Sequence, residues 1–251
     1  MSCAPDEAAL RIPGAGGLNL HGCFAERGGA LGLFVHGFRS DASGTKSLAF
    51  AEHARRRGYS WLRGDLRGHG HSEGGPEGFR LSALLDDLLV FLDRFPGRPA
   101  VLIGSSMGGW LATLAAERRF QVRGLILLAP AFNFIQDQVG RLPEAELAAW
   151  QRDGRRRFVS DSGEAYELDY AALQDAQAFD CLHRAVSLSC PVRILHSVQD
   201  EVVPVSVSRA FARACRAPAF ELTEIPDGDH RLHAALPQVC AALDGLWPAE
   251  Q

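Results

Sequence analysis

The sequence predicts an α/β fold in which a mostly parallel central sheet carries helices on both faces. Apolar runs of strand type alternate with helical stretches from about residue 31 onward, an order typical of parallel sheets. Residues 81–95 repeat leucine at helical spacing, which predicts a helix packed on that sheet. The chain has 251 residues and is 47% hydrophobic, enough to bury one substantial core. We therefore expect a single domain over residues 1–251.

The elements follow in chain order. Two short strands at 9–12 and 18–25 predict an antiparallel hairpin at one edge of the sheet. Gly58 closes the helix that follows the first parallel strand, and Pro96-Gly97 closes the leucine-rich helix. The further elements expected are a strand at 31–35, a helix at 46–57, strands at 59–64 and 101–103, a helix at 110–119, and strands at 124–128, 191–197 and 219–225.

The alternation breaks over residues 131–188, which predicts a helical lid inserted at the strand ends. Within it we expect amphipathic helices at 143–157 and 168–179. Its apolar side chains either line an acyl pocket or pack the lid on the body, and the candidates include Phe132, Phe134 and Trp150. Arg155, next to two further arginines, either attracts an anionic substrate or belongs to a solvated helix face.

Ser106 lies in a Gly-x-Ser-x-Gly motif between a strand-like run and a helix-like stretch. That context is the one a nucleophile elbow requires. Glycines at 104 and 108 avoid a collision in the sharp turn, and the helix from Met107 points its amide-rich end at any anion formed there. The alternatives are a plain surface turn, or Ser105 as nucleophile, although Ser105 lacks the flanking glycine spacing.

Asp200 and His230 are the expected partners of Ser106. A serine hydroxyl needs a base, and a carboxylate holds that base in the correct tautomer. Asp200 follows the strand at 191–197, and His230 follows the strand at 219–225. The order Ser, Asp, His is the order found in hydrolases with this elbow. Glu201 remains an alternative to Asp200.

For the other polar residues in these loops we expect structural roles. Asp227 and Asp229 are expected to shape the turn before His230. The Gly-x-Gly after residue 67 lacks the third glycine of a dinucleotide site, and its two histidines lack further metal ligands. We expect no metal. The histidines assigned structural or surface positions are His36, His69, His71, His183, His196 and His233.

An oxyanion hole is expected from the backbone N–H groups of Phe38 and Met107. Phe38 stands in the loop after the strand at 31–35, and Met107 follows the nucleophile. The side chain of His36 is expected to brace that loop rather than act as a base.

These residues together resemble the α/β-hydrolase superfamily, over about residues 31–233. The segments at 36–41, 44–46, 104–110 and 227–232 are similar to the abhydrolase-domain group of acyl-protein thioesterases and acyl-glucuronide esterases and its bacterial relatives. The resemblance implies an α/β-hydrolase fold and hydrolysis of carboxylic esters or thioesters without a metal or other cofactor.

The net charge and the cysteine content indicate which partners and which cellular compartment to expect. A formal net charge of −4 gives no support for nucleic-acid or membrane binding. The six scattered cysteines and the absence of a signal-like N-terminus predict free thiols and a cytoplasmic location.

The sequence thus predicts a serine hydrolase that cleaves small-molecule acyl esters or thioesters through an acyl-enzyme. One alternative keeps the three residues and cleaves the amide of a small peptide. Another keeps only the fold and binds a ligand without catalysis. A perhydrolase or haloperoxidase side activity is compatible with the same residues.

Overall fold

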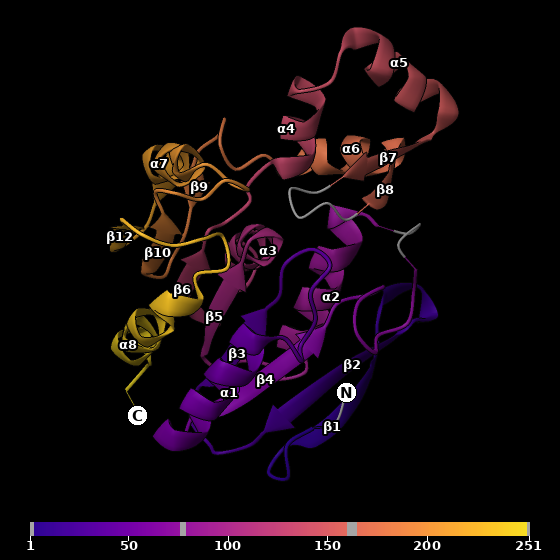
Figure 1. The fold of residues 1–251 in the computed structure, drawn as a ribbon. Coiled ribbons are helices and arrows are strands. Elements are labelled where there is room, and N and C mark those ends of the chain that lie inside the picture. Colours follow the sequence, from indigo (N-terminus) through magenta and orange to yellow (C-terminus); the bar gives the residue numbers. More distant parts are fainter. Residues whose placement is uncertain (1–2, 76–78, 160–164, 250–251) are drawn as a thin grey trace.

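A computed structural model describes residues 3–75, 79–159 and 165–249, and its centre is an eight-stranded sheet (Figure 1). The strand order is β1-β2-β4-β3-β5-β6-β10-β12. β1 and β2 form the predicted antiparallel edge hairpin, β2 pairs antiparallel with β4, and all later neighbours are parallel. The predicted mostly parallel sheet is confirmed. Its strands are β1 Ala8–Pro13, β2 Asn19–Ala25, β3 Leu31–Val35, β4 Ser60–Asp65, β5 Ala100–Ser105, β6 Val122–Leu128, β10 Val192–Ser197 and β12 Phe220–Ile225.

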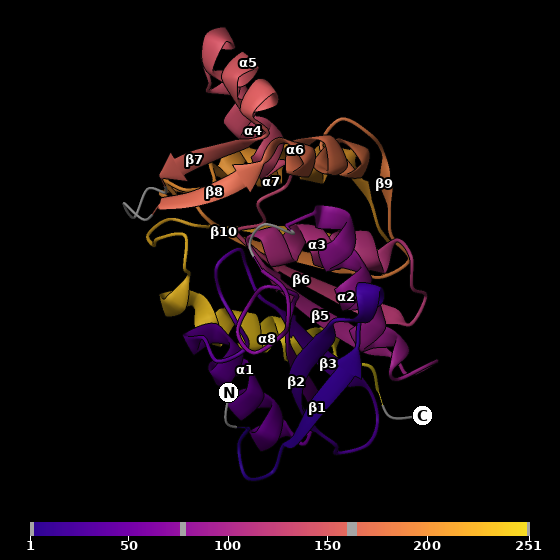
Figure 2. The same ribbon diagram turned by 90° about the vertical axis from the view of Figure 1, so that its right-hand side faces the viewer.

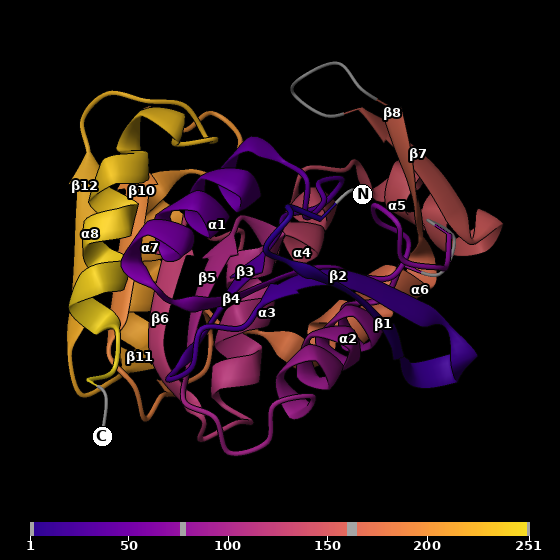
Figure 3. The ribbon, with the colours of Figure 1, turned by 90° about the horizontal axis from the view of Figure 1, so that it is seen from below.

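Helices cover both faces of this sheet (Figure 3). The alternation of side chains along β5 shows why. Val101 and Ile103 belong to the apolar core on the side of α1 and α8, whereas Ala100 and Leu102 belong to the core on the side of α2, α3 and α7. The two buried faces make β5 continuously apolar, as expected for a central parallel strand. These helices are α1 Thr45–Arg57, α2 Leu81–Asp93, α3 Met107–Ala116, α7 Val205–Ala214 and α8 Leu236–Leu246. None of the helices in the described ranges combines the length and apolarity needed to cross a bilayer.

Between β6 and β10 the chain leaves the sheet and lies above the carboxyl ends of the strands (Figure 2). We call residues 131–188 the lid segment. Its elements are α4 Phe134–Gly140, α5 Glu144–Asp153, β7 Arg155–Val159, β8 Ala165–Asp169, α6 Tyr170–Ala176, the 3-10 turn Gln177–Phe179 and the short strand β9 Val186–Ser187, which pairs with β11 Cys215–Arg216.

The predicted lid helix at 143–157 is too long. α5 ends at Asp153 because Gly154 adopts a left-handed conformation, with φ of 75°. The chain then returns through the antiparallel hairpin β7–β8, so Arg155 lies on a strand and not on a helix face. The lid is therefore helical only in part.

Two of the six cysteines are not free, in contrast to the expectation from the sequence. Cys3 and Cys23 form a disulfide. Cys23 lies on β2, and a turn in which the Glu7 amide donates to the Ala4 carbonyl separates Cys3 from β1. Cys181, Cys190, Cys215 and Cys240 are free thiols, as predicted.

Candidate active site

Ser106 lies on a strained turn between the end of β5 and the start of α3. Its φ of 55° and ψ of −122° are outside the regions that L-residues normally occupy. A Cβ on Gly104 would lie 2.4 Å from the carbonyl oxygen of Gly108, and one on Gly108 would lie 2.1 Å from that of Val35. Only glycine fits at both positions, so the Gly-x-Ser-x-Gly spacing is a steric requirement of this turn.

The fold brings Ser106, His230 and Asp200 into one series of hydrogen bonds. The Nε2 atom of His230 is 3.1 Å from Ser106 Oγ, and its Nδ1 atom is 2.7 Å from Asp200 Oδ2. A carboxylate can only accept, so Nδ1 carries the proton and Nε2 accepts from the serine hydroxyl. Three loops that follow three parallel strands thus meet at the carboxyl edge of the sheet.

Asp200 is buried, and hydrogen-bond donors surround its carboxylate. Oδ1 accepts from the backbone N–H groups of Val202 and Val203, at 2.9 and 2.8 Å. Oδ2 accepts from His230 and also lies 3.2 Å from Nε2 of His196. Burial alone would raise the pKa of Asp200, but the hydrogen bonds from His196 and His230 outweigh it and hold that pKa below its usual value. The carboxylate is therefore ionised at neutral pH.

His196 has the structural position expected for it. It is fully buried on β10. Its Nδ1 atom is 2.7 Å from Ser208 Oγ, and its Nε2 atom is 2.8 Å from the carbonyl oxygen of Val203. Through these contacts it links α7 and the Asp200 loop.

The other acidic residues near Asp200 and His230 in the sequence are exposed or make other hydrogen bonds. Glu201 is exposed at the cavity wall, while its neighbour Asp200 takes the bond to His230. Asp229 Oδ1 accepts the amides of Arg231 and Leu232, as expected of a turn former. Asp227 accepts a long bond from the side chain of Gln199.

The loop after β3 lies directly against the serine. A Cβ on Gly37 would be 3.2 Å from Cβ of Ser106, closer than an ordinary van der Waals contact, so glycine favours this close approach. His36 braces this loop: its Nδ1 donates to the Gly37 carbonyl and its Nε2 accepts the Leu66 amide. Complete burial, aided by the nearby His69, lowers the pKa of His36 to about 3, so the ring is neutral. Phe38 follows in this loop, and Met107 is the first residue of α3, where amides have no acceptor within the helix.

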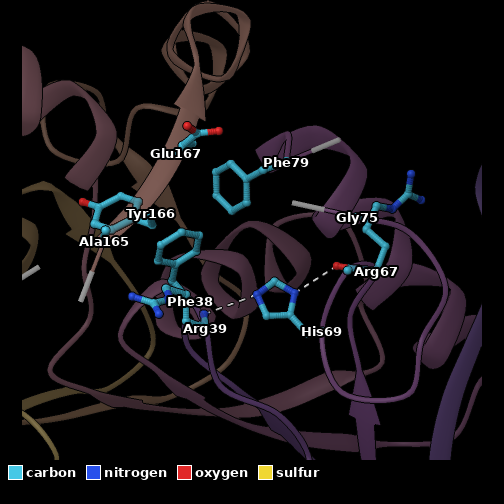
Figure 4. A pocket seen from close by; sticks show the side chains of 10 residues that line it. Phe38, Arg39, Arg67, His69, Gly75, Phe79, Ala165, Tyr166 and Glu167 are labelled. Carbon is cyan, nitrogen blue, oxygen red and sulfur yellow. Dashed lines mark hydrogen bonds between the residues drawn. The ribbon is translucent and has the colours of Figure 1, made fainter. Parts of the chain in front are cut away.

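The histidine-containing turn after β4 is a structural turn. The Asp65 carboxylate accepts the amides of Ala42 and His71, at 2.7 and 2.9 Å. Gly70 has a φ of 51° and packs directly over that carboxylate. His69 bonds the Arg67 carbonyl and the Arg39 amide, as drawn in Figure 4. Through these two contacts, His69 links the turn after β4 to the loop after β3.

A cavity of about 920 Å³ opens over Ser106 and His230. Its walls come from the loop after β3, the start of α1, the His230 loop and the lid segment. Phe134 and Tyr166, two of the apolar lid side chains expected either to line an acyl pocket or to pack the lid, both belong to it. Tyr166 lies on β8. The start of α1, with Lys46 and Ser47, was not anticipated. Its sequence signal is a glycine N-cap, which leaves the helix end uncapped.

Phe132 and Trp150 pack the lid rather than line this cavity, the second of the two roles considered for them. Phe132 is fully buried and stacks on Phe211 of α7, with ring centroids 4.2 Å apart. Trp150 is buried, and its Nε1 donates to the carbonyl of Leu168 at 2.9 Å. Both side chains belong to the apolar core, which extends from the sheet into the lid segment.

Arg155 is not directed to the cavity, in contrast to the hypothesis of an anion-attracting face. Its Nε donates to Asp169 at 2.9 Å, and Glu167 lies 3.8 Å from its guanidinium. The hairpin β7–β8 places these acidic residues beside it. Its charge is thus compensated within the lid.

A second pocket of about 310 Å³ adjoins the cavity. Figure 4 shows the rings of Phe38, Phe79 and Tyr166 facing one another beside it. Phe38 and Tyr166 line both the pocket and the cavity. Their rings pack edge to face, with ring centroids 5.3 Å apart. The two rings form an apolar wall next to the serine.

Comparison with known proteins places the chain among hydrolases. The profile of the "Alpha/beta hydrolase family" matches residues 33–243. The bovine mitochondrial palmitoyl-protein thioesterase ABHD10 is 31% identical over 207 residues, which are 80% of this chain and 66% of that protein. This chain thus spans slightly less than two thirds of that relative's length.

Solved structures of hydrolases resemble this chain over nearly its whole length. Mouse alpha/beta hydrolase domain-containing protein 10 has a TM-score of 0.88 at 27% identity, covering 95% of this chain and 98% of that chain. A putative hydrolase from Agrobacterium vitis has the same TM-score at 29% identity, covering 96% and 98%. Est1E from Butyrivibrio proteoclasticus, with ferulic acid bound, has a TM-score of 0.78 at 25% identity, covering 94% and 97%.

Proposed function

Because the chain belongs to the alpha/beta hydrolase family, we propose that it cleaves carboxylic esters or thioesters through an acyl-enzyme on Ser106. One observation carries the proposal: an unbroken series of hydrogen bonds runs from Ser106 Oγ through His230 to the ionised Asp200. Such a series supplies a nucleophile, a base and the group that orients the base.

In the first half-reaction, Ser106 Oγ attacks the acyl carbon while His230 Nε2 takes the hydroxyl proton. The imidazolium so formed is stabilised by Asp200 through Nδ1. When the tetrahedral intermediate collapses, the bond to the alcohol or thiol breaks, and His230 returns the proton to that leaving group. A water molecule then repeats the sequence on the acyl-enzyme and releases the carboxylic acid.

The amides of Phe38 and Met107 are proposed to hold the oxyanion. Two features support them: the contact of Gly37 with Ser106, and the place of Met107 at the start of α3. The positive end of the helix dipole adds to the field at that point.

The acyl group is proposed to lie against Phe38, Phe134 and Tyr166, the apolar part of the cavity. The name of the ABHD10 relatives, palmitoyl-protein thioesterase, and the ferulic acid bound to Est1E support an acyl ester or thioester as substrate. The lid segment, which carries Phe134 and Tyr166, is proposed to cover this acyl group.

The test combines a fluorophosphonate probe with a substrate panel. Wild-type protein should be labelled stoichiometrically and should hydrolyse p-nitrophenyl esters and the matching thioesters. Ser106→Ala should lose labelling, and its kcat should fall by several orders of magnitude. Near-wild-type turnover in that variant would refute the assignment. Faster cleavage of anilides than of esters would favour the amidase alternative, and a folded wild type without labelling or turnover would favour ligand binding alone.

A further inference from the structure

His230 stands in a loop without helix or strand, at residues 226–232. The Asp229 carboxylate accepts two amides of the same loop, and these bonds close a turn within it. The buried side chain of Leu232 anchors the end of the loop in the core. The side chain of His230 is 19% exposed, so close packing does not fix the ring by itself. Polar contacts from other elements therefore determine how firmly His230 is held.

Ser197, the last residue of β10, holds this loop from the sheet. Its Oγ atom donates to the carbonyl of Gly228 at 2.7 Å, two residues before His230. The same oxygen accepts the amide of Gln199 at 3.1 Å, in the loop that leads to Asp200. Ser197 is fully buried and is not among the described residues that line the cavity. One hydroxyl thus links the loop of the base to the loop of the carboxylate that orients it.

Lys46, the single lysine of the chain, holds the same loop from α1. Its Nζ atom donates to the carbonyl of Arg231 at 2.9 Å, one residue after His230. Burial lowers the pKa of Lys46 to about 8, partly opposed by Asp229 and Asp200, so the ammonium is the main form at neutral pH. A charged donor makes a stronger hydrogen bond than a neutral one. The two sides of His230 are therefore held by two distant elements.

We propose that Lys46 and Ser197 are positioning residues, which hold the His230 loop so that the imidazole stays within hydrogen-bond reach of Ser106. This inference rests on the proposed hydrolysis, because it gives the two side chains a role in that reaction. Both accept-or carbonyls lie within two residues of His230, so a shift of either one moves the imidazole. A misplacement of about 1 Å can cost about 10²-fold in rate.

The first test removes each donor and measures the steps that need His230. With a neutral p-nitrophenyl ester, Ser197→Ala and Lys46→Met should lower kcat on the order of tenfold, because the base is less often in reach of the serine hydroxyl. Since Ser197 does not line the described cavity, Ser197→Ala should leave KM within about twofold of wild type. The rate at which a fluorophosphonate labels Ser106 should fall in proportion to kcat.

A spectroscopic measurement separates positioning from structural support. The proton that His230 Nδ1 donates to Asp200 across 2.7 Å should give a far-downfield proton NMR signal, assigned by its absence from His230→Ala. The signal should move upfield or broaden in Ser197→Ala and Lys46→Met, because that hydrogen bond lengthens when the loop shifts. A loss of stability alone would leave the signal of the folded protein unchanged.

Conservative variants and a matched control complete the set. Lys46→Arg and Ser197→Thr keep a donor and should recover most of kcat. Ser60→Ala is the control, because Ser60 is equally buried and makes the same kinds of bond: its Oγ donates to the Gly28 carbonyl at 2.8 Å and accepts the Arg27 amide at 2.7 Å. Ser60 is the first residue of β4, at the edge of the sheet opposite the site. Its loss should leave kcat and the NMR signal as in wild type.

The possible results separate this inference from the proposed function. If Ser197→Ala and Lys46→Met lower the melting temperature but leave kcat as in Ser60→Ala, the inference fails while the hydrolysis stands. If Lys46→Met raises only KM, Lys46 contacts the substrate and does not position His230. If folded wild type is neither labelled nor active on the ester, the proposed function fails and the inference fails with it.

Discussion

At the scale of single residues, the environment of Asp200 determines whether the site can work. Its two oxygens accept from two backbone amides and two imidazoles. This set of donors explains how a buried carboxylate stays charged beside His230. Glu201, adjacent in sequence, is exposed and has no comparable set of contacts among the described residues.

Asp200→Asn should retain the fold and lose most activity. The amide of asparagine donates where Oδ2 now accepts, so His230 is held in the wrong tautomer. We expect kcat for a p-nitrophenyl ester to fall on the order of 10⁴-fold. Circular dichroism should show wild-type secondary structure, and a variant that keeps more than a tenth of the activity would contradict the role of Asp200.

At the scale of elements, the first turn of α3 packs so closely against the sheet that no side chain fits between the two backbones. The virtual Cβ of Gly108 meets the carbonyl oxygens of Val35 and His36 at 2.1 and 2.5 Å. Neither atom belongs to a flexible side chain, so the contact cannot relax without moving β3. The turn at Ser106 is therefore a rigid contact point between β3, β5 and α3.

Gly108→Ala should fail to fold or lose several kcal/mol of unfolding free energy, since overpacking against backbone costs at least about 1–3 kcal/mol. Gly140→Ala is the matched control, because its Cβ would have no neighbour within 4 Å. Gly140 is the last residue of α4, so alanine there should be neutral or slightly stabilising. Urea denaturation measures both. Equal stability of the two variants would contradict this steric account.

The lid arginines should not affect the choice of substrate. Arg155 pairs with Asp169, and Arg156 pairs with Glu146. Arg155→Gln combined with Arg156→Gln should leave KM for anionic and neutral esters within about twofold of wild type, since exposed ion pairs are worth about 0–1 kcal/mol. A selective increase in KM for the anionic ester would restore these arginines as an anion site.

At the scale of the whole molecule, the disulfide ties the start of the described chain to the edge hairpin. The two cysteines are separated by 20 residues. The expectation of free thiols therefore fails for this pair, and the cytoplasmic location inferred partly from it stays a prediction.

Thiol titration in denaturant without reductant should detect four reactive cysteines of six. Cys3→Ser should lower the unfolding free energy by about 3 kcal/mol, the loop entropy of such a closure. Cys240→Ser, at a free cysteine, is the control and should change stability far less. Six reactive thiols in the wild type would show that the bond does not form.

The sequence by itself determined the parallel sheet, the elbow at Ser106 and the order of Ser106, Asp200 and His230. It did so because these depend on local patterns: apolar runs, glycine spacing and loops that follow strands. Only the tertiary structure decided which residues enclose the cavity. Trp150 bonds the backbone of β8 within the lid, and Phe132 stacks on Phe211 of α7. Arg155 pairs with Asp169 on the lid hairpin, and Lys46 bonds the His230 loop across 185 residues of sequence. Such contacts between distant segments depend on how layers pack, and no local pattern encodes them.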